Sequence, residues 1–93
     1  MKKKRVAITG LGLVTPAGND VASTWATLQS GRSMGAPITI FDASGFSTRI
    51  AAEVKGFDPL HWIEKKDVKK VDRFMQFAIA ASDIALRDAA FVV

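Results

Sequence analysis

The stretch that decides the fold covers residues 64–89 and reads EKKDVKKVDRFMQFAIAASDIALRDA. Its apolar residues recur at three- and four-residue steps, the spacing that places side chains on one face of a helix. The sequence therefore predicts one long amphipathic helix, Glu64–Ala89. The small residue Ser82 takes the one polar place in the apolar row, and aromatic and branched residues widen that face. The predicted buried residues are Val68, Val71, Met75, Ala78, Ser82, Ala85 and Ala89, with Phe74, Phe77 and Ile84 beside them.

The other face of this predicted helix is basic. Four cations near its start are three, four and seven positions apart, so they form one stripe over the first two turns. Cations at a helix N-terminus oppose the macrodipole, which costs roughly 0.3–1 kcal/mol each, and nearby Asp67 and Asp72 offset only part of this. The stripe is either a solvated helix face or a surface for an anionic partner. It consists of Lys66, Lys69, Lys70 and Arg73.

The composition is that of one small globular domain. The 93 residues are 48% hydrophobic and carry a formal net charge of +4. The N-terminal run Lys2–Arg5 supplies four positive charges, so the rest of the chain is neutral. Short terminal lysine runs are usually solvated tails, and the basic stripe lacks interleaved aromatic residues. Nucleic-acid binding is therefore not expected.

The reactive side chains are few. There is no cysteine, which excludes disulfides, thiolate zinc sites and a cysteine nucleophile within these residues. The single histidine, His61, lies in a predicted turn, and we expect it to be exposed or half-packed and not catalytic. We expect no metal site. No stretch approaches the ~20 apolar residues of a membrane span, so a cytoplasmic location is expected.

The N-terminal segment Arg5–Val14 reads as a strand that is apolar on both faces, with Gly10 and Gly12 leaving room for close packing. These glycines also begin a G-x-G-x-x-G dinucleotide fingerprint, but Thr15 takes the third position. The next helix starts too far on to hold a pyrophosphate over Gly12. Close packing is the favoured interpretation, and no cofactor is expected.

Turn and cap signals organise the next segment. Thr15–Gly18 predicts a turn, and Asn19 or Asp20 caps a helix over Val21–Ser30 that Gly31 ends. We expect three apolar side chains on the inner face of that helix. They are Val21, Trp25 and Leu28.

The middle of the chain is predicted to be a long connection, residues 32–47, with a short extended piece at Ile38–Phe41. A strand is expected at Thr48–Val54, with Ile50, Ala52 and Val54 inward and Arg49 and Glu53 outward. Asp58-Pro59 is typical of a helix start and predicts a short turn before the long helix. Because a two-sided apolar strand needs neighbours on both sides, these few elements suggest an incomplete piece of a larger α/β domain, or a chain that assembles with others.

Several motifs together resemble the opening of the β-ketoacyl-ACP synthases, most of all the type II condensing enzymes of bacterial fatty-acid elongation. The resemblance covers essentially the whole chain in matching order, with a small departure at Met34-Gly35-Ala36. Its main motifs are RVAITGLGLVTPAGN (Arg5–Asn19), RIAAEVKGF (Arg49–Phe57) and DRFMQFA (Asp72–Ala78).

The resemblance implies the fold and the chemistry of the parent protein. It implies an α/β, thiolase-like five-layer α-β-α-β-α fold, of which residues 1–93 would be an incomplete N-terminal part of the N-terminal domain, in a homodimeric enzyme. The family reaction is a decarboxylative Claisen condensation of acyl and malonyl groups carried on acyl carrier protein. A cysteine thiolate takes the acyl group and two histidines stabilise developing negative charge. None of these three residues is in this chain, so no catalytic residue is expected here.

The resemblance also gives the basic stripe a partner. In the family the corresponding helix start belongs to the positive surface where acidic acyl carrier protein docks. Lys66, Lys69 and Lys70 match the basic positions of the family, and the adjacent Lys65 and Arg73 are added to the expected docking residues. A non-catalytic homologue that still binds carrier protein, such as a truncated synthase or a polyketide chain-length factor, remains the alternative.

Overall fold

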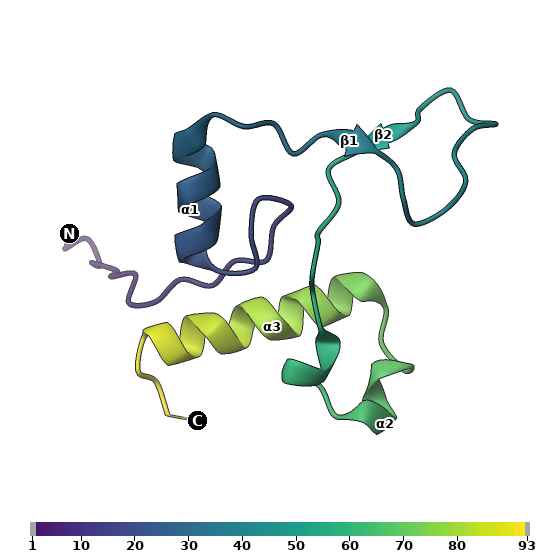
Figure 1. Cartoon of the computed structure of the whole chain (residues 1–93). Coiled ribbons are helices and arrows are strands. Elements are labelled where there is room, and N and C mark those ends of the chain that lie inside the picture. The colour runs from purple at the N-terminus through teal and green to yellow at the C-terminus, as the bar shows by residue number, and fades with distance from the viewer. Residues whose placement is uncertain (1, 93) are drawn as a thin grey trace. The chain divides into compact units, whose positions relative to one another are not determined.

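The computed structural model describes residues 2–92 and divides the chain into two units. One unit joins the segment up to Gly12 with the segment from Pro59 onward, and the other holds Leu13–Asp58. Within the described residues the first unit contains the 3-10 turn η1 (Pro59–His61), the short helix α2 (Lys65–Val68) and the long helix α3 (Arg73–Asp88). The second contains helix α1 (Val21–Ser30) and the strands β1 (Ala36–Pro37) and β2 (Ile50–Ala51) (Figure 1).

The predicted single helix Glu64–Ala89 is wrong, because the chain leaves the helical path between α2 and α3. Lys69 closes α2, and Asp72 adopts an extended conformation with ψ of 164° before α3 begins. The buried side chain of Gln76 donates from Nε2 to the carbonyl oxygens of Val68 and Val71, each at 3.4 Å. The break is therefore stabilised, since two backbone carbonyls that lose helical partners there gain a side-chain donor.

Helix α3 packs closely against the extended segment around Gly10 and Gly12. A Cβ on Gly10 would lie 2.8 Å from the Cβ of Ala89, and one on Gly12 would lie 2.7 Å from the amide nitrogen of Ala85. Real Cβ atoms do not approach so closely, so only glycine fits at both positions. The Asp88 carboxylate of α3 also accepts a hydrogen bond of 2.9 Å from the Leu11 amide. The prediction that these glycines serve close packing is confirmed.

The buried face of α3 differs from the predicted one. Gln76 and Ala80 are buried, whereas Met75 is 40% exposed and Ser82 and Ala78 are exposed. The prediction assumed that the helix continues unbroken from Val68 and Val71 into α3. Because the helix is interrupted at residues 69–72, α3 buries a different set of side chains. Among the flanking residues Phe77 and Ile84 are half-buried, while Phe74 is exposed.

The predicted strand Arg5–Val14 does not form in this structure. In the described part of the chain the one sheet pairs β1 with β2, and Val6 and Ile8 are 91% and 82% exposed. An extended segment becomes a strand only when its backbone groups bond to a neighbouring strand. Residues 2–92 provide no such neighbour for this segment.

The turn and helix predictions for the second unit are confirmed. Thr15 and Gly18 exchange backbone hydrogen bonds of 2.8 and 3.1 Å. Helix α1 spans Val21–Ser30; Asp20 caps it by accepting from the Ser23 amide at 2.7 Å, and Gly31 ends it with φ of 72°. The positive φ explains the glycine.

The predicted inner face of α1 is wrong for two of its three residues, and Val21 is half-buried. Trp25 and Leu28 are 58% and 62% exposed, and the buried residue of the helix is Thr24. The Thr24 hydroxyl lies 3.1 Å from that of Thr15, and the Thr27 hydroxyl donates to the Ala17 carbonyl at 2.8 Å. Hydroxyl contacts to the preceding turn, rather than apolar side chains, hold this face.

The hairpin is shorter than the sequence predicts. Strands β1 and β2 pair antiparallel, Ala36 with Ala51, in place of the extended pieces expected at Ile38–Phe41 and Thr48–Val54. The expected alternation is also wrong, because Ile50 is 65% exposed and Glu53 is half-buried. The Glu53 carboxylate turns toward the opposite arm, where it accepts a hydrogen bond of 2.8 Å from the Thr39 hydroxyl.

Candidate functional site

The five predicted docking cations lie on two helices and the turn between them. Lys65 and Lys66 are in α2, the next two follow it, and Arg73 is the first residue of α3. They are all exposed, and we call them the basic patch: Lys65, Lys66, Lys69, Lys70 and Arg73. The prediction of one stripe along one helix face is therefore wrong. Because the helix is interrupted at residues 69–72, the five cations lie on two helices and the turn between them.

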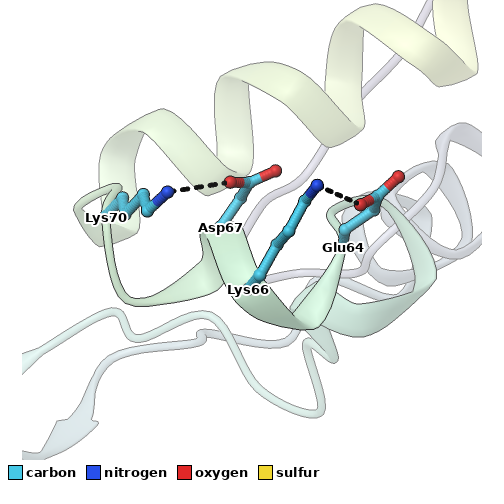
Figure 2. Close-up of polar contacts among 4 residues, drawn as sticks. All are labelled: Glu64, Lys66, Asp67 and Lys70. Carbon is cyan, nitrogen blue, oxygen red and sulfur yellow. Dashed lines mark ion pairs between the residues drawn. The ribbon is translucent and has the colours of Figure 1, made fainter.

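Two lysines of the patch are held by carboxylates of the same segment. Lys66 Nζ lies 3.4 Å from a carboxylate oxygen of Glu64, and Lys70 Nζ lies 3.6 Å from one of Asp67. Figure 2 shows Lys70 reaching toward Asp67 and Lys66 toward Glu64, as two neighbouring pairs on the same segment. These pairs are open to solvent, because all four side chains are at least 45% exposed.

The other cations have different surroundings. Arg73 lies over the ring of Phe77, with its guanidinium carbon 5.0 Å from the ring centroid. Within residues 2–92 no ion pair involves Lys65 or Lys69, and both are exposed. Residues 64–73 hold five cations and three carboxylates, so the segment keeps a net charge of +2.

One of the two ion pairs could be read from the sequence and the other could not. Asp67 and Lys70 are three residues apart, a spacing that brings side chains together on a helix. Glu64 and Lys66 are only two apart, a spacing that separates side chains on a helix. They meet because Glu64 precedes α2 in an extended conformation, with φ of −63° and ψ of 142°.

His61 and the glycine fingerprint at Gly10–Gly12 do not form a reactive site in this structure. His61 ends η1 and is exposed, as expected. Among the described residues there is no group of three or more His, Asp or Glu side chains placed to hold a metal ion. The Gly10–Gly12 segment is covered by α3, and the first turn of α1 is already capped by the Asp20 carboxylate. These contacts favour the packing role of the glycines over phosphate binding.

The helices of residues 2–92 include none that is both long and apolar enough to cross a membrane. The basic patch is the strongest candidate surface in the described residues, because residues 64–73 place five exposed cations together and keep a net positive charge.

Comparison with known proteins shows the family of the chain. Residues 3–92 match the model of the β-ketoacyl synthase N-terminal domain. The chain is 45% identical over 93 residues to 3-oxoacyl-[acyl-carrier-protein] synthase 2 of Synechocystis sp., covering 100% of this chain and 22% of that protein. It is 50% identical over 88 residues to the protein of the same name from Coxiella burnetii, covering 95% of this chain and 21% of the relative.

A polyketide relative and a solved structure give the same picture. The chain is 46% identical over 86 residues to a putative polyketide β-ketoacyl synthase 1 of Streptomyces cyaneus, covering 91% of this chain and 20% of that one. The solved structure of the ishigamide ketosynthase/chain length factor matches with a TM-score of 0.81 and 38% identity, over 91% of this chain and 21% of the other.

These matches share one feature, their coverage: the chain spans about a fifth of the length of the relatives it matches. The structural likeness confirms the α/β, thiolase-like fold class that the sequence predicted. With its family model matched from residue 3 to residue 92, the chain belongs to the β-ketoacyl synthase family, within its N-terminal domain.

Proposed function

We propose that this chain is the N-terminal segment of a β-ketoacyl-ACP synthase of fatty-acid elongation. We further propose that this segment binds acyl carrier protein through the basic patch. The observation that carries the proposal is the patch itself: five exposed cations between residues 65 and 73, in a chain whose family is shown. The names of two relatives include acyl carrier protein, which supports the same partner here.

The charge of the patch suits such a partner. Carrier proteins present acidic helices and a phosphate, and a positive surface raises the rate of encounter and fixes the register more than it adds affinity. Screening over roughly 8–10 Å at physiological ionic strength confines this attraction to groups that come close. Exposed lysines on a turn can approach a partner helix closely, because they stand open to solvent.

The bond-making chemistry is proposed to lie outside these residues. In the proposed reaction a cysteine thiolate displaces the carrier thiol and takes the acyl group as a thioester. Loss of carbon dioxide from the malonyl group leaves a carbanion, which attacks that thioester and expels the thiolate. The 93 residues hold no cysteine and one exposed histidine, so the chain alone is expected to be inactive.

The remaining features of the parent enzyme follow as part of the proposal. Residues 1–93 would form an incomplete N-terminal part of its N-terminal domain. The complete enzyme would be a cytoplasmic homodimer that uses no cofactor, and acyl and malonyl groups would both reach it on carrier protein.

Charge reversal tests the docking proposal. The variant Lys66→Glu/Lys69→Glu/Lys70→Glu should abolish the binding of dye-labelled apo acyl carrier protein, measured by fluorescence anisotropy. Reversal of Lys2, Lys3 and Lys4 is the matched control, because it changes the net charge equally and leaves the patch intact. Equal losses in both variants, or unchanged binding in the patch variant, would refute docking at the patch. Duplex DNA at moderate salt should not bind.

Acyl transfer tests the predicted inactivity. Radiolabelled acyl-ACP incubated with the purified chain should leave no stable label on it, because no thiol is present to carry the acyl group. Stable covalent labelling of the chain would refute its predicted inactivity.

A second candidate function is a non-catalytic subunit that binds carrier protein. It is favoured by one observation, the likeness to a structure described as a ketosynthase/chain length factor. The two candidates differ in the residues that accompany this chain in its gene. A cysteine after a strand, followed later by two histidines, would support the synthase, and their absence would support the non-catalytic subunit.

A further inference from the structure

We propose that Glu64 and Asp67 regulate the basic patch by competing with an acidic partner for Lys66 and Lys70. Lys65 and Lys69 would then make the first contact with the partner, and Lys66 and Lys70 would join only after leaving their own carboxylates. This inference rests on the proposed function and names the residues that set the affinity and selectivity of that same surface.

The geometry divides the lysines into two classes. Lys66 and Lys70 lie 3.4 and 3.6 Å from carboxylate oxygens of Glu64 and Asp67. These distances exceed those of a short charge-assisted hydrogen bond, about 2.7–2.9 Å, so the contacts are electrostatic and loosely held. Lys65 and Lys69 share the same short segment and have no such ion pair within residues 2–92.

The pairs are weak enough to exchange. The Lys66 and Glu64 side chains are 74% and 75% exposed, and those of Lys70 and Asp67 are 72% and 45% exposed. An exposed ion pair shifts an equilibrium by a factor of roughly 1.5 to 5, which the carboxylates of a partner can overcome. A single small anion must compete with a carboxylate already in place, whereas a row of partner carboxylates can replace both at once.

The surface therefore favours a densely acidic protein helix over isolated anions. The two built-in carboxylates lower the affinity for every anion, but they lower it least for a partner that replaces both of them. Such intramolecular competition is a form of selectivity against the wrong partner.

Neutralising each carboxylate tests the inference. Glu64→Gln and Asp67→Asn should each bind apo acyl carrier protein about two- to five-fold more tightly than the wild-type chain, as expected for release of one exposed ion pair. Asp42→Asn is the control. It changes the net charge equally, and the Asp42 carboxylate accepts a hydrogen bond from the Ser44 amide rather than pairing with the patch. Its effect should stay below about two-fold, because it reports only the general change of charge.

A double-mutant cycle shows whether the gain passes through the proposed pair. In a Lys66→Ala background the gain from Glu64→Gln should fall to the size of the Asp42→Asn effect, because the lysine that pairs with Glu64 is then absent. Far-UV circular dichroism of each variant should match the wild type, since these side chains are open to solvent.

The outcomes separate this inference from the proposed function. If the wild-type chain binds and both neutralised variants gain no more than Asp42→Asn, the competition is refuted and the docking proposal stands. The competition is refuted in the same way if the gain from Glu64→Gln persists in the Lys66→Ala background. If the wild-type chain and the neutralised variants all fail to bind carrier protein, the proposed function itself is overturned.

Discussion

Replacing Gly12 by alanine should strongly destabilise the unit that contains α3. The added Cβ would meet the carbonyl oxygen of Ala81 and lie 2.7 Å from the amide nitrogen of Ala85. Both are backbone atoms of α3, so the clash can be relieved only if the helix moves away from the segment. Overpacking of this kind costs about 1–3 kcal/mol.

The matched control is Gly45→Ala, where an added Cβ would have no neighbour within 4 Å. Where the backbone permits alanine, that change stabilises by about 0.4–1 kcal/mol through the unfolded state. The two variants should therefore differ by roughly 1.5–4 kcal/mol, adding these two ranges. With an m-value of about 1–3 kcal/mol per molar urea, the midpoint for Gly12→Ala should fall by roughly 0.5–4 M relative to the control.

The assay is urea unfolding followed by tryptophan fluorescence in a Trp25→Phe background. That change leaves Trp62 as the reporter, and its ring lies 5.6 Å from the guanidinium of Arg87 in α3. If Gly12→Ala unfolds at the same urea concentration as Gly45→Ala, the close contact between Gly12 and α3 is wrong.

Three further predictions concern single side chains. Gln76→Ala removes the donor at the break before α3 and should lower the free energy of unfolding by about 1–3 kcal/mol in urea. The exposed control Gln29→Ala should lower it little, and equal losses of stability in the two variants would contradict this role of Gln76. Asp20→Ala removes the cap of α1 and should cost about 0.5–2 kcal/mol, with Asp20→Ser restoring most of it, and an unchanged stability would contradict the cap. The hydrogen bond from the Thr39 hydroxyl, with smaller help from backbone amides, lowers the pKa of Glu53 from its ordinary 4.5. The stability from this hydrogen bond is therefore complete above pH 4.5 and is lost as pH falls through the lowered pKa. The protection factor of the Thr39 amide, its slowing of exchange relative to an unstructured chain at the same pH, should fall at acid pH in the wild type but not in Glu53→Gln.

Local signals predicted the turn at Thr15–Gly18 and the two ends of α1 because the forces there are local. The cap at Asp20 and the positive φ at Gly31 are set by residues within one turn of each end of α1, and the sequence shows both directly. The inner face of the same helix was predicted wrongly. Apolar periodicity favoured Trp25 and Leu28, but the face is held by threonine hydroxyls against the preceding turn.

The first unit shows what periodicity does not reveal. The apolar steps of Glu64–Ala89 run unbroken through residues 69–72, and the break depends on a contact that reaches back from Gln76. The segment Arg5–Val14 has the composition of a buried strand, but a strand also needs backbone partners beside it, which its own sequence cannot supply.

The sequence predicted which cations form the basic patch but did not predict how they are arranged. Charge and spacing identified four of the five cations of the basic patch, and the family resemblance added Lys65. The sequence did not predict the pair between Glu64 and Lys66, because the extended conformation before α2 could not be read from helical spacing. That pair is central to the proposed competition, since it separates the occupied lysines from the available ones.

The most direct test of carrier-protein docking at the basic patch is chemical-shift mapping of the ¹⁵N-labelled chain with unlabelled apo acyl carrier protein. We expect the largest shift changes on the amides of residues 64–73, and we expect them to disappear when Lys66, Lys69 and Lys70 are changed to Glu. Changes centred on the β1–β2 hairpin, or changes at residues 64–73 that persist in the charge-reversed variant, would contradict docking at the patch.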